Sequence, residues 1–320
     1  MVDQTRRIGW IGMGRMGFPM AERLLKAGNK VSIYNRTKSK AEPLAASGAT
    51  IIDKPSDLAG MDVVFAIVSE GKDLIEVLFG PNGAASGGPG KVPKIIVDCS
   101  SISVEESAEV RKRLAVAGSD FVAAPVSGNG KCVKAGKLSS VMSGPEAACL
   151  SVKSLIESYA PRGVTYVGEG ELSRICKIAH NVMLGVVIQN LCEITVLANK
   201  AGVPREAFLK FMNNSVMGSI FTAYKSPALV NLDWTTTFTP KLLRKDLDLG
   251  LDLAHGLDVS MPVTAATREA LQQHMGLASQ KPDPAAYLAA DFATLLETIA
   301  AGAGLKLKPE NKDVPSGLES

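Results

Sequence analysis

Short apolar runs alternate with amphipathic stretches over the first half of the chain. The runs are rich in β-branched residues and apolar at consecutive positions, which is typical of strands that are covered on both faces. They occupy Ile8–Ile11, Lys30–Tyr34, Asp62–Val68, Lys94–Asp98 and Asp120–Val126. The stretches with helical periodicity between them are Met16–Ala27, Ser39–Ala46, Lys72–Phe79 and Val104–Ala117. Strands that alternate with helices predict an α/β fold with a doubly wound parallel sheet.

The pattern becomes helical from about residue 168. The stretch from Glu171 to Ala201 has no internal proline and ends before Gly202–Pro204, so it predicts one helix of about 45 Å. The residues that follow also have helical periodicity. We therefore expect a sheet domain over residues 1–167, an all-α domain over 168–304 that begins with a long inter-domain helix, and a flexible tail over 305–320.

One stretch of the second half fits two patterns. In Asp246–Ala254, leucines stand at alternate positions as in a strand, although aspartate and glycine are poor strand formers. Leu242, Leu249 and Leu253 also fall on one face of a helix. Periodicity alone leaves this stretch undecided between strand and helix.

The composition is that of an ordinary folded protein and argues against several classes of function. Of the 320 residues, 46% are hydrophobic and 21% are charged, and the net charge is +3. This charge is too small to argue for nucleic-acid binding but suits a small anionic ligand, and 5% aromatic residues are too few for base stacking. The longest apolar stretch, Val182–Ile188, falls far short of the ~20 residues that span a membrane. With no signal peptide before Arg6, we expect a cytoplasmic protein that binds no membrane.

The cysteines and histidines predict neither a disulfide framework nor a metal centre. The five cysteines form no C-x-x-C pair and are odd in number, which favours free thiols in a reducing compartment. Three histidines are too few for a His-rich metal site, so we expect no metal. Cys132 and Cys176 lie close to motifs described below, but nothing nearby in the sequence activates either thiol.

A glycine motif follows the first predicted strand and precedes an amphipathic helix. In this setting the first glycine of G-x-G-x-x-G permits a tight turn, the second lets a pyrophosphate approach the backbone, and the third lets helix and strand pack closely. The free N–H groups of the helix N-terminus then face the phosphates. We therefore predict a Rossmann dinucleotide-binding domain. Its cofactor-binding loop comprises Gly12, Met13, Gly14, Arg15, Met16 and Gly17.

The end of the second predicted strand indicates which cofactor is preferred. An NAD-selective site usually has Asp or Glu there, but this chain has Asn35, followed by Arg36 and Thr37. A carboxylate would repel a 2′-phosphate, whereas a guanidinium and a hydroxyl would bind one. We therefore expect NADP to be preferred. NAD is the alternative, in which case Arg36 and the lysines after it form only a solvated basic rim.

Two polar residues near the start of the long predicted helix are candidates for chemistry. Lys177 and Asn181 are four residues apart and share a helix face, although such a pair is usual on a solvated surface. A lysine there could give a proton to a developing alkoxide during carbonyl reduction, or remove one during alcohol oxidation. That role needs a lowered pKa, to which the like charge of Arg174 would contribute. Asn181 could hold a substrate through its amide.

Four stretches carry a more specific signal when they are taken together. They are the glycine motif Gly9–Leu24, the loop Ala124–Asn129, the helix start Lys177–Asn181 and the motif Lys245–Leu249. In this order and spacing they resemble the β-hydroxyacid dehydrogenase family, which includes 3-hydroxyisobutyrate dehydrogenases and semialdehyde reductases. The resemblance implies that Asp246–Ala254 is helical. It also implies a homodimer or homotetramer.

The resemblance implies roles for single residues at the substrate. Lys177 matches the catalytic lysine of the family, and Asn181 matches the amide beside it. Ser127 and Gly128 match the loop that receives the substrate carboxylate through a hydroxyl and backbone N–H groups. Asn129 follows them in this loop and is expected to contact the substrate as well.

Further roles concern the cofactor. Lys245 matches a lysine near both nicotinamide and substrate. Val68 and Ser69 match the turn over the adenosine ribose, and Ser101 matches a hydroxyl position that contacts the cofactor. We therefore expect hydride transfer between NADP and a small β-hydroxyacid or aldehyde acid, with Lys177 as proton donor and acceptor.

The chain departs from the family pattern around the substrate loop. Ala123 replaces an acidic residue, Asn129 a second glycine and His180 a frequent asparagine, so the identity of the acid stays open. For His180 we expect packing or orientation of its neighbours ahead of direct catalysis. Lys177 argues against imine reductases, which typically lack the lysine.

Two alternative functions remain open. The first is a non-catalytic dinucleotide-binding protein, against which the presence of Lys177 counts. The second keeps the enzyme class but has a phosphorylated or sulfonated hydroxy acid as substrate. Lysines that could bind its extra anionic group, although a solvated face is their more common role, are Lys131, Lys134 and Lys137.

Overall fold

The computed structural model describes residues 6–319 and divides into two compact units, one up to Lys177 and one from Ile178 onward. The expected boundary, after residue 167, lies ten residues before this division. The expectation placed the whole of the long helix in the second domain. In the structure the first turn of this helix belongs to the first unit. Its residues Ser173 and Arg174 are buried there and hydrogen-bonded to the ends of sheet strands.

The first unit is built on a six-stranded sheet whose neighbouring strands are all parallel, in the order β3-β2-β1-β4-β5-β6. The predicted doubly wound α/β fold is therefore confirmed. The chain winds outward from β1 to β3 and then returns to place β4 on the other side of β1. In such sheets, ligands bind beyond the carboxyl ends of the strands at this reversal. The strands are β1 (Ile8–Ile11), β2 (Val31–Tyr34), β3 (Thr50–Ile51), β4 (Val63–Ala66), β5 (Ile95–Asp98) and β6 (Asp120–Ala123).

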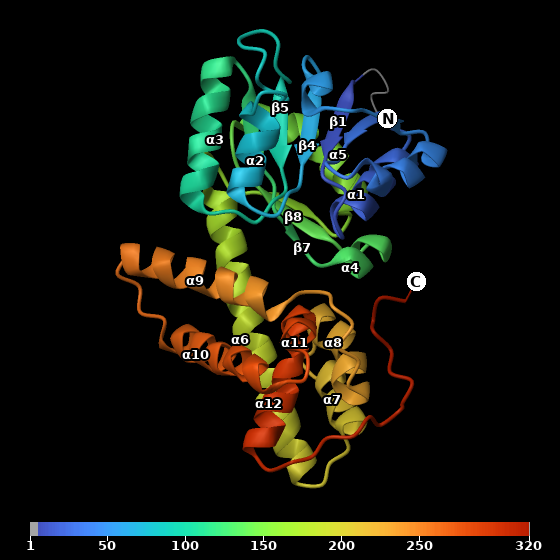
Figure 1. Cartoon of the computed structure of the whole chain (residues 1–320), viewed down its shortest axis with the longest axis vertical. Coiled ribbons are helices and arrows are strands. Elements are labelled where there is room, and N and C mark those ends of the chain that lie inside the picture. The colour runs from blue at the N-terminus through green and yellow to red at the C-terminus, as the bar shows by residue number, and fades with distance from the viewer. Residues whose placement is uncertain (1–5, 320) are drawn as a thin grey trace. The chain divides into compact units, whose positions relative to one another are not determined.

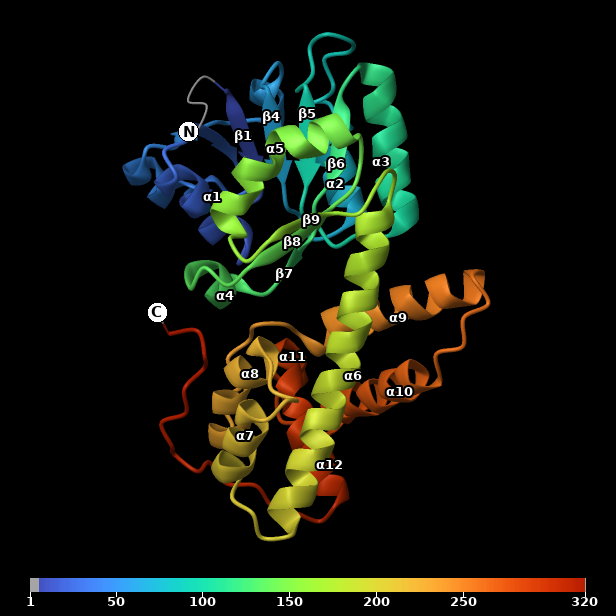
Figure 2. The same cartoon turned by 180° about the vertical axis from the view of Figure 1, so that it is seen from behind.

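Helices cover both faces of this sheet, because neighbouring strand residues point to opposite faces. On one face Trp10 and Phe65 stack at 5.4 Å, and Tyr159 of α5 meets both rings edge-on. On the other face Ile11 and Val64 form a core with residues of α2 and α3. Figures 1 and 2 show α2 and α5 on opposite sides of the sheet. The helices of this unit are α1 (Gly17–Lys26), α2 (Gly71–Phe79), α3 (Val104–Ala117), α4 (Gly130–Lys134) and α5 (Glu146–Tyr159).

Two expected elements are divided in the structure, and each contains a proline. The expected strand Asp120–Val126 ends at Ala123, because Pro125 has no N–H group with which to continue a ladder. The chain resumes as β7, which pairs antiparallel with β8, while β8 pairs parallel with β9. The expected helix Ser39–Ala46 is a pair of 3₁₀ segments on either side of Ala41, the second with Pro43 in its first turn. The small sheet, which the sequence analysis did not predict, consists of β7 (Val126–Ser127), β8 (Ser139–Met142) and β9 (Val164–Tyr166).

All the regular elements of the second unit are helices over its described residues, as expected. The ambiguous stretch Asp246–Ala254 lies inside α9, where Leu247 is fully buried, so the helical alternative is correct. Two glycines let α6 and α9 approach closely. A Cβ atom on Gly185 would lie 2.8 Å from the Leu247 side chain, and one on Gly250 would overlap Val182. The helices, labelled in Figure 2, are α6 (Leu172–Lys200), α7 (Arg205–Asn214), α8 (Ile220–Asn231), α9 (Pro240–Gly256), α10 (Pro262–Gly276), α11 (Pro284–Ala289) and α12 (Leu295–Gly302).

Helix α6 forms the centre of the second unit's core. Its residues Ile188, Cys192 and Val196 are buried against residues of α8, α9 and α12. By length and by a mean hydropathy of 1.6, this helix could cross a membrane, but half of its apolar window is buried inside the structure. We therefore interpret it as a core helix.

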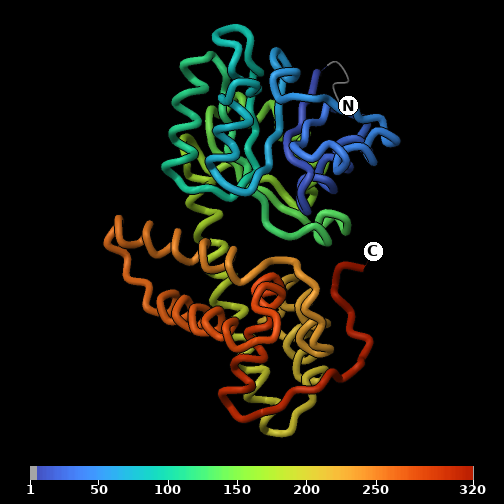
Figure 3. The backbone as a smooth tube through the Cα atoms, viewed as in Figure 1, coloured from blue at the N-terminus to red at the C-terminus, as the bar shows by residue number. Residues whose placement is uncertain are grey.

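The segment 305–319 has no helix or strand but is held on the second unit, which differs from the flexible tail that its composition predicts. Arg205 donates a hydrogen bond to the carbonyl of Lys308, and Glu310 accepts from the backbone N–H of Arg205. Leu305 and Leu307 pack against the core of this unit. Figure 3 follows the segment past α7 and α8.

Candidate active site

The glycine loop after β1 has the geometry that each of its glycines was predicted to provide. Gly12 has a φ of +100°, and a Cβ atom there would overlap the carbonyl oxygen of Ile67. A Cβ atom on Gly17 would overlap the carbonyl oxygen of Gly12, so only glycine lets α1 start so close to β1. By contrast, apart from its chain neighbours, no atom of the described residues lies within 4 Å of a Cβ position on Gly14. The loop is therefore tight at its two ends and open at its centre, which fits a pyrophosphate approaching the backbone.

Asn35, at the end of β2, braces this loop from the side. Its Oδ1 accepts a hydrogen bond of 2.8 Å from the N–H of Met13, and its Nδ2 donates one of 2.7 Å to the carbonyl of Thr37. Arg36 follows with a 90% exposed side chain, whose contact with Asp73 is a long 3.9 Å. Arg36 and Thr37 thus extend into solvent beyond the strand end, where both are accessible to a ligand.

A second loop, the serine loop Ser127–Asn129, lies against the glycine loop. Gly128 has a φ of +129°, and Asn129 caps α4 by accepting hydrogen bonds of 2.9 and 3.1 Å from the next two free N–H groups. The two donors are the N–H groups of Lys131 and Cys132. They fix the Asn129 carboxamide, whose buried Nδ2 has no hydrogen-bond partner among the described residues. Gly130, the first residue of α4, directly follows this loop, and a Cβ atom on it would lie 2.8 Å from the carbonyl oxygen of Arg15, so the end of the serine loop meets the glycine loop. The predicted cofactor loop and the predicted carboxylate loop are therefore neighbours within one unit.

The turns after β4 and β5 form the remaining part of this edge. Val68 and Ser101 are half-buried and Ser69 is exposed. The N–H of Val68 donates a hydrogen bond of 2.9 Å to Ser100 Oγ, and Ser100 Oγ donates one of 2.7 Å to Asp98 Oδ1. The predicted cofactor contact Val68 is thus held by Ser100 and, through it, by Asp98, two residues to which the sequence assigned no role.

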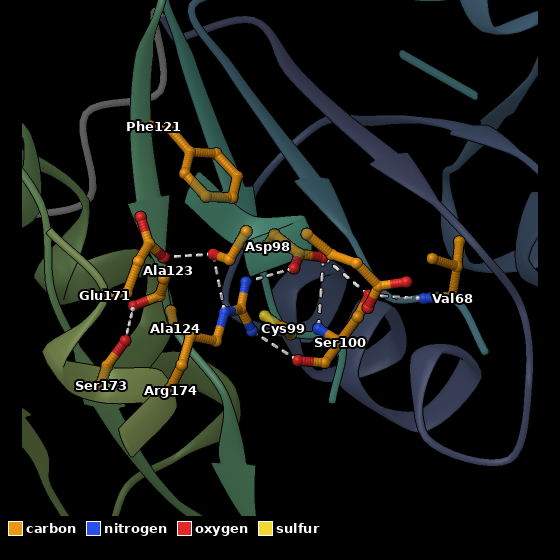
Figure 4. A network of polar contacts seen from close by, with 12 residues as sticks. Val68, Asp98, Cys99, Ser100, Phe121, Ala123, Ala124, Glu171, Ser173 and Arg174 are labelled. Atoms are coloured by element: carbon orange, nitrogen blue, oxygen red, sulfur yellow. Dashed lines mark hydrogen bonds and ion pairs between the residues drawn. The ribbon is translucent and has the colours of Figure 1, made fainter. Parts of the chain in front are cut away.

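Arg174 completes this group and corrects one expectation. Figure 4 shows its side chain lying between Asp98 and Ser100, with an ion pair to Asp98 Oδ2. From the sequence we expect Arg174 to act as a like charge beside Lys177. In the structure its charge is instead paired with a buried carboxylate, because the side chain points into the end of the sheet. One feature of the sequence could have indicated a partner for Arg174, namely that the charged residue Asp98 ends an otherwise apolar strand.

Asn181 and Lys245 meet at a carboxylate of the second unit. Asn181, 7% exposed, donates a hydrogen bond of 2.6 Å to Asp246 Oδ2, and Lys245 Nζ lies 3.5 Å from Asp246 Oδ1. His180 Nδ1 lies 2.9 Å from Asn181 Oδ1, a hydrogen bond that requires the proton on Nδ1. His180 therefore orients its neighbour, as expected, and both polar atoms of the Asn181 amide have a protein partner. Asp246 is a further residue that the sequence analysis left without a role.

Lys177 stands at the end of the first unit, one turn of α6 after Arg174, and its side chain is half-buried. Asn181 follows one turn later on the same helix. The two residues therefore lie on the same face of α6, as their spacing predicts. Their roles toward a substrate remain predictions.

The thiols and metal-binding side chains do not add to this site. Burial raises the pKa of the Cys132 thiol and raises that of Cys99 to about 12, so neither is a ready nucleophile. Within residues 6–319, no group of three or more His, Cys, Asp or Glu side chains is arranged to hold a metal ion.

Comparison with known proteins agrees with both halves of the fold. Residues 7–168 match the family model described as the NAD binding domain of 6-phosphogluconate dehydrogenase. Residues 171–305 match the model described as NAD-binding of NADP-dependent 3-hydroxyisobutyrate dehydrogenase. The two matches together span the described strands and helices.

Individual relatives are similar over most of their length. The chain is 32% identical to the chloroplastic glyoxylate/succinic semialdehyde reductase 2 of Arabidopsis thaliana over 273 residues, which are 83% of this chain and 74% of the relative. It is 30% identical to the 2-hydroxy-3-oxopropionate reductase of Escherichia coli over 264 residues, 82% of this chain and 89% of the relative. The fold is shared with the crystal structure of a 3-hydroxyisobutyrate dehydrogenase from Salmonella typhimurium, with a TM-score of 0.79, 23% identity, and 92% and 99% of the two chains covered. Together with the glycine loop and the serine loop, these similarities establish that the chain belongs to the β-hydroxyacid dehydrogenase family.

Proposed function

We propose that this NAD(P)-dependent oxidoreductase uses NADPH to reduce a small aldehyde acid, or oxidises the corresponding β-hydroxyacid, with Lys177 as the proton donor and acceptor. The observation that carries the proposal is the contact between the glycine loop and the serine loop at Arg15 and Gly130. It supports a substrate carboxylate held beside the cofactor. When bound, the nicotinamide supplies or accepts the hydride.

The protein's own residues have distinct tasks in this proposal. The hydroxyl of Ser127 and the N–H groups after it bind the substrate carboxylate. Lys177 donates a proton to the carbonyl oxygen as it becomes an alkoxide, and takes the proton back in the reverse direction. Asn181 and Lys245 both contact Asp246, and their roles toward the substrate and the nicotinamide are proposed from the family resemblance.

The catalytic role of Lys177 is tested by turnover with a panel of two- to four-carbon aldehyde and hydroxy acids. Lys177→Ala should lower kcat by about 10²- to 10⁴-fold, because it removes the proton-transfer group. The dissociation constant for NADPH should stay within about twofold of the unchanged protein. Lys210→Ala, an exposed lysine on α7, is the control and should leave kcat unchanged. Turnover by Lys177→Ala near the unchanged rate would overturn the assignment.

The preference for NADP is proposed to come from Arg36 and Thr37. A charge-assisted hydrogen bond contributes about 1.5–3 kcal/mol, so Arg36→Ala should weaken NADPH binding by about 10- to 100-fold and leave NADH binding nearly unchanged. Arg162→Ala, an exposed arginine elsewhere on the first unit, is the control for the loss of positive charge. Equal losses for both cofactors in Arg36→Ala would contradict a 2′-phosphate contact.

The assembly is proposed from the family alone, and the location from the cysteine content. A homodimer or homotetramer and a cytoplasmic location remain predictions, and the Arabidopsis thaliana relative is named as chloroplastic. Sedimentation of the purified protein and fractionation of the cells that produce it would test them.

A further inference from the structure

A buried ion pair connects the start of α6 to the end of β5. The side chains of Arg174 and Asp98 are 1% and 0% exposed. The guanidinium donates from all three nitrogens: Nη2 to Asp98 Oδ2, Nη1 to the carbonyl of Ser100 at 2.5 Å, and Nε to Ser107 Oγ at 3.1 Å. A guanidinium has a fixed planar arrangement of donors, so these bonds fix the direction of the side chain as well as its charge.

The second carboxylate oxygen of Asp98 extends the connection to β4. Asp98 Oδ1 accepts hydrogen bonds from the N–H of Ser100 at 3.2 Å and from its hydroxyl at 2.7 Å. The same hydroxyl oxygen accepts a hydrogen bond of 2.9 Å from the N–H of Val68. A continuous chain of bonds therefore runs from α6, through the end of β5, to the turn between β4 and α2 (Figure 4).

Other contacts at the start of α6 hold it on neighbouring elements of the first unit, and Ser107 Oγ, which accepts from Arg174, also donates to Glu171. Ser173 Oγ donates to the carbonyl of Ala123 at 2.9 Å, and Glu171 pairs with Arg111 at 2.6 Å. These bonds hold the helix start on β6 and α3. Arg174 connects it in addition to the turn that carries the proposed cofactor contacts Val68 and Ser69.

The same helical turn leads to Lys177, three residues after Arg174 and about 4.5 Å further along the helix axis. Proton and hydride transfer need the reacting groups in register, and a misplacement of about 1 Å can cost about 10²-fold in rate. A link that holds the lysine's helix and the cofactor turn together would maintain this register.

We propose that Arg174, Asp98 and Ser100 are positioning residues that hold the cofactor turn at Val68 and the Lys177 turn of α6 in one fixed arrangement. This inference rests on the proposed function, because it assigns Val68 to the cofactor and Lys177 to the proton. None of the three residues needs to touch substrate. Their effect is on the placement of groups that do.

The second unit offers a matched control. Thr237 Oγ1 accepts a hydrogen bond of 2.8 Å from Lys225 and donates one of 2.7 Å to Asp291, as Ser100 Oγ accepts from Val68 and donates to Asp98. Thr237→Val and Ser100→Ala each remove one such bridging hydroxyl. Each should lower the Tm by about 2–4 °C. Only the Ser100 change should affect the cofactor.

The experiment measures the NADPH dissociation constant by fluorescence titration, together with kcat and KM. Ser100→Ala should raise the dissociation constant about 3- to 10-fold, the effect of one net hydrogen bond, and Thr237→Val should leave it within about twofold. Arg174→Lys keeps the positive charge but loses the planar set of guanidinium donors. It should lower kcat at saturating NADPH by about 10-fold or more, with a much smaller change in KM.

The possible outcomes separate the two hypotheses. If Ser100→Ala does not fold, Ser100→Cys keeps the side-chain size with a much weaker acceptor and should show the same direction of change. NADPH dissociation constants within twofold of the unchanged protein in the folded Ser100 variants, or kcat unchanged in Arg174→Lys, would overturn the positioning role. A protein that binds NADPH but turns over no acid of the panel would contradict the proposed function, while the binding comparison would still decide the link to Val68. A protein that does not bind NADPH overturns both.

Discussion

Two buried ion pairs, one in each unit, are alike in burial but not in what they connect. Arg174 and Asp98 are 1% and 0% exposed, and Lys225 and Asp291 are 2% and 1% exposed. In both, the carboxylate also accepts a hydrogen bond from at least one backbone N–H group and one from a neighbouring hydroxyl. Burial acts to raise the pKa of Asp291, but the charge and hydrogen bond of Lys225 hold it below its usual value.

The difference lies at the far side of each carboxylate. Asp291 accepts from the N–H groups of Thr237 and Ala293, and Lys225 Nζ lies 4.2 Å from the centre of the Phe292 ring. All of these groups belong to the helical unit itself. Asp98 instead leads through Ser100 to a turn at the carboxyl ends of the strands, where the cofactor is proposed to bind. Burial and charge pairing therefore show only that each pair is needed for the structure. A role in function is indicated by what the carboxylate's hydrogen bonds lead to, which for Asp98 is the turn at Val68.

Breaking either pair should have the largest effect on stability. Arg174→Met and Lys225→Met each leave a buried carboxylate without its cation, so each should lower the free energy of unfolding by about 3–5 kcal/mol. Urea denaturation of the two variants measures this. The double variant Lys225→Met with Asp291→Asn should recover part of the loss, and a loss below about 1 kcal/mol in either single variant would contradict tight coupling of the pairs.

The pH dependence of stability distinguishes the two units further, because the second unit contains a buried histidine, His274. Burial, and then the charge of Lys281, lower the pKa of His274 from 6.5 to about 4. Between these values the unfolded chain binds a proton that the folded chain does not, so stability falls as the pH decreases from 6.5 to 4. The loss amounts to about 3 kcal/mol.

The control for this titration is His274→Gln. The difference in unfolding free energy between the unchanged protein and this variant should shrink by that amount over the same pH range. A difference that stays constant from pH 6.5 to pH 4 would show that His274 does not titrate as described.

Glycine substitutions separate stability from binding with smaller effects. A Cβ atom on Gly250 would overlap Val182, so Gly250→Ala should cost about 1–3 kcal/mol of stability without changing NADPH affinity. Gly14 has open space around its Cβ position, so Gly14→Ala should change stability by less than about 0.5 kcal/mol. It should nevertheless weaken NADPH binding, because the methyl group occupies the approach of the pyrophosphate. Thermal denaturation and NADPH titration of both variants measure these effects. Weaker NADPH binding by Gly250→Ala, or unchanged binding by Gly14→Ala, would contradict the prediction.

The sequence predicts the parts of this molecule that depend on local pattern. The strand Ile8–Ile11 and the helix Val104–Ala117 have the bounds that periodicity predicts, and Ser103 with Glu106 forms a capping box at the start of that helix. The glycine loop could be predicted because its spacing and its flanking elements are both local.

The remaining features depend on contacts between distant residues. Asp98 and Arg174 are 76 positions apart, and nothing in their neighbourhoods along the chain indicates that they pair. The same holds for Lys225 and Asp291, which are 66 positions apart. The short strands β7 to β9 carry too few residues for a periodic pattern, and only their pairing defines them.

The most direct test of the account is NADPH binding by the two variants in which a buried pair is broken. Fluorescence titration at a temperature where both are folded should give a dissociation constant at least about 10-fold higher for Arg174→Met than for the unchanged protein, because its cofactor turn has lost a support. The constant for Lys225→Met should lie within about twofold of the unchanged value. Equal dissociation constants for the two variants would contradict the claim that only the pair of the first unit serves the cofactor site.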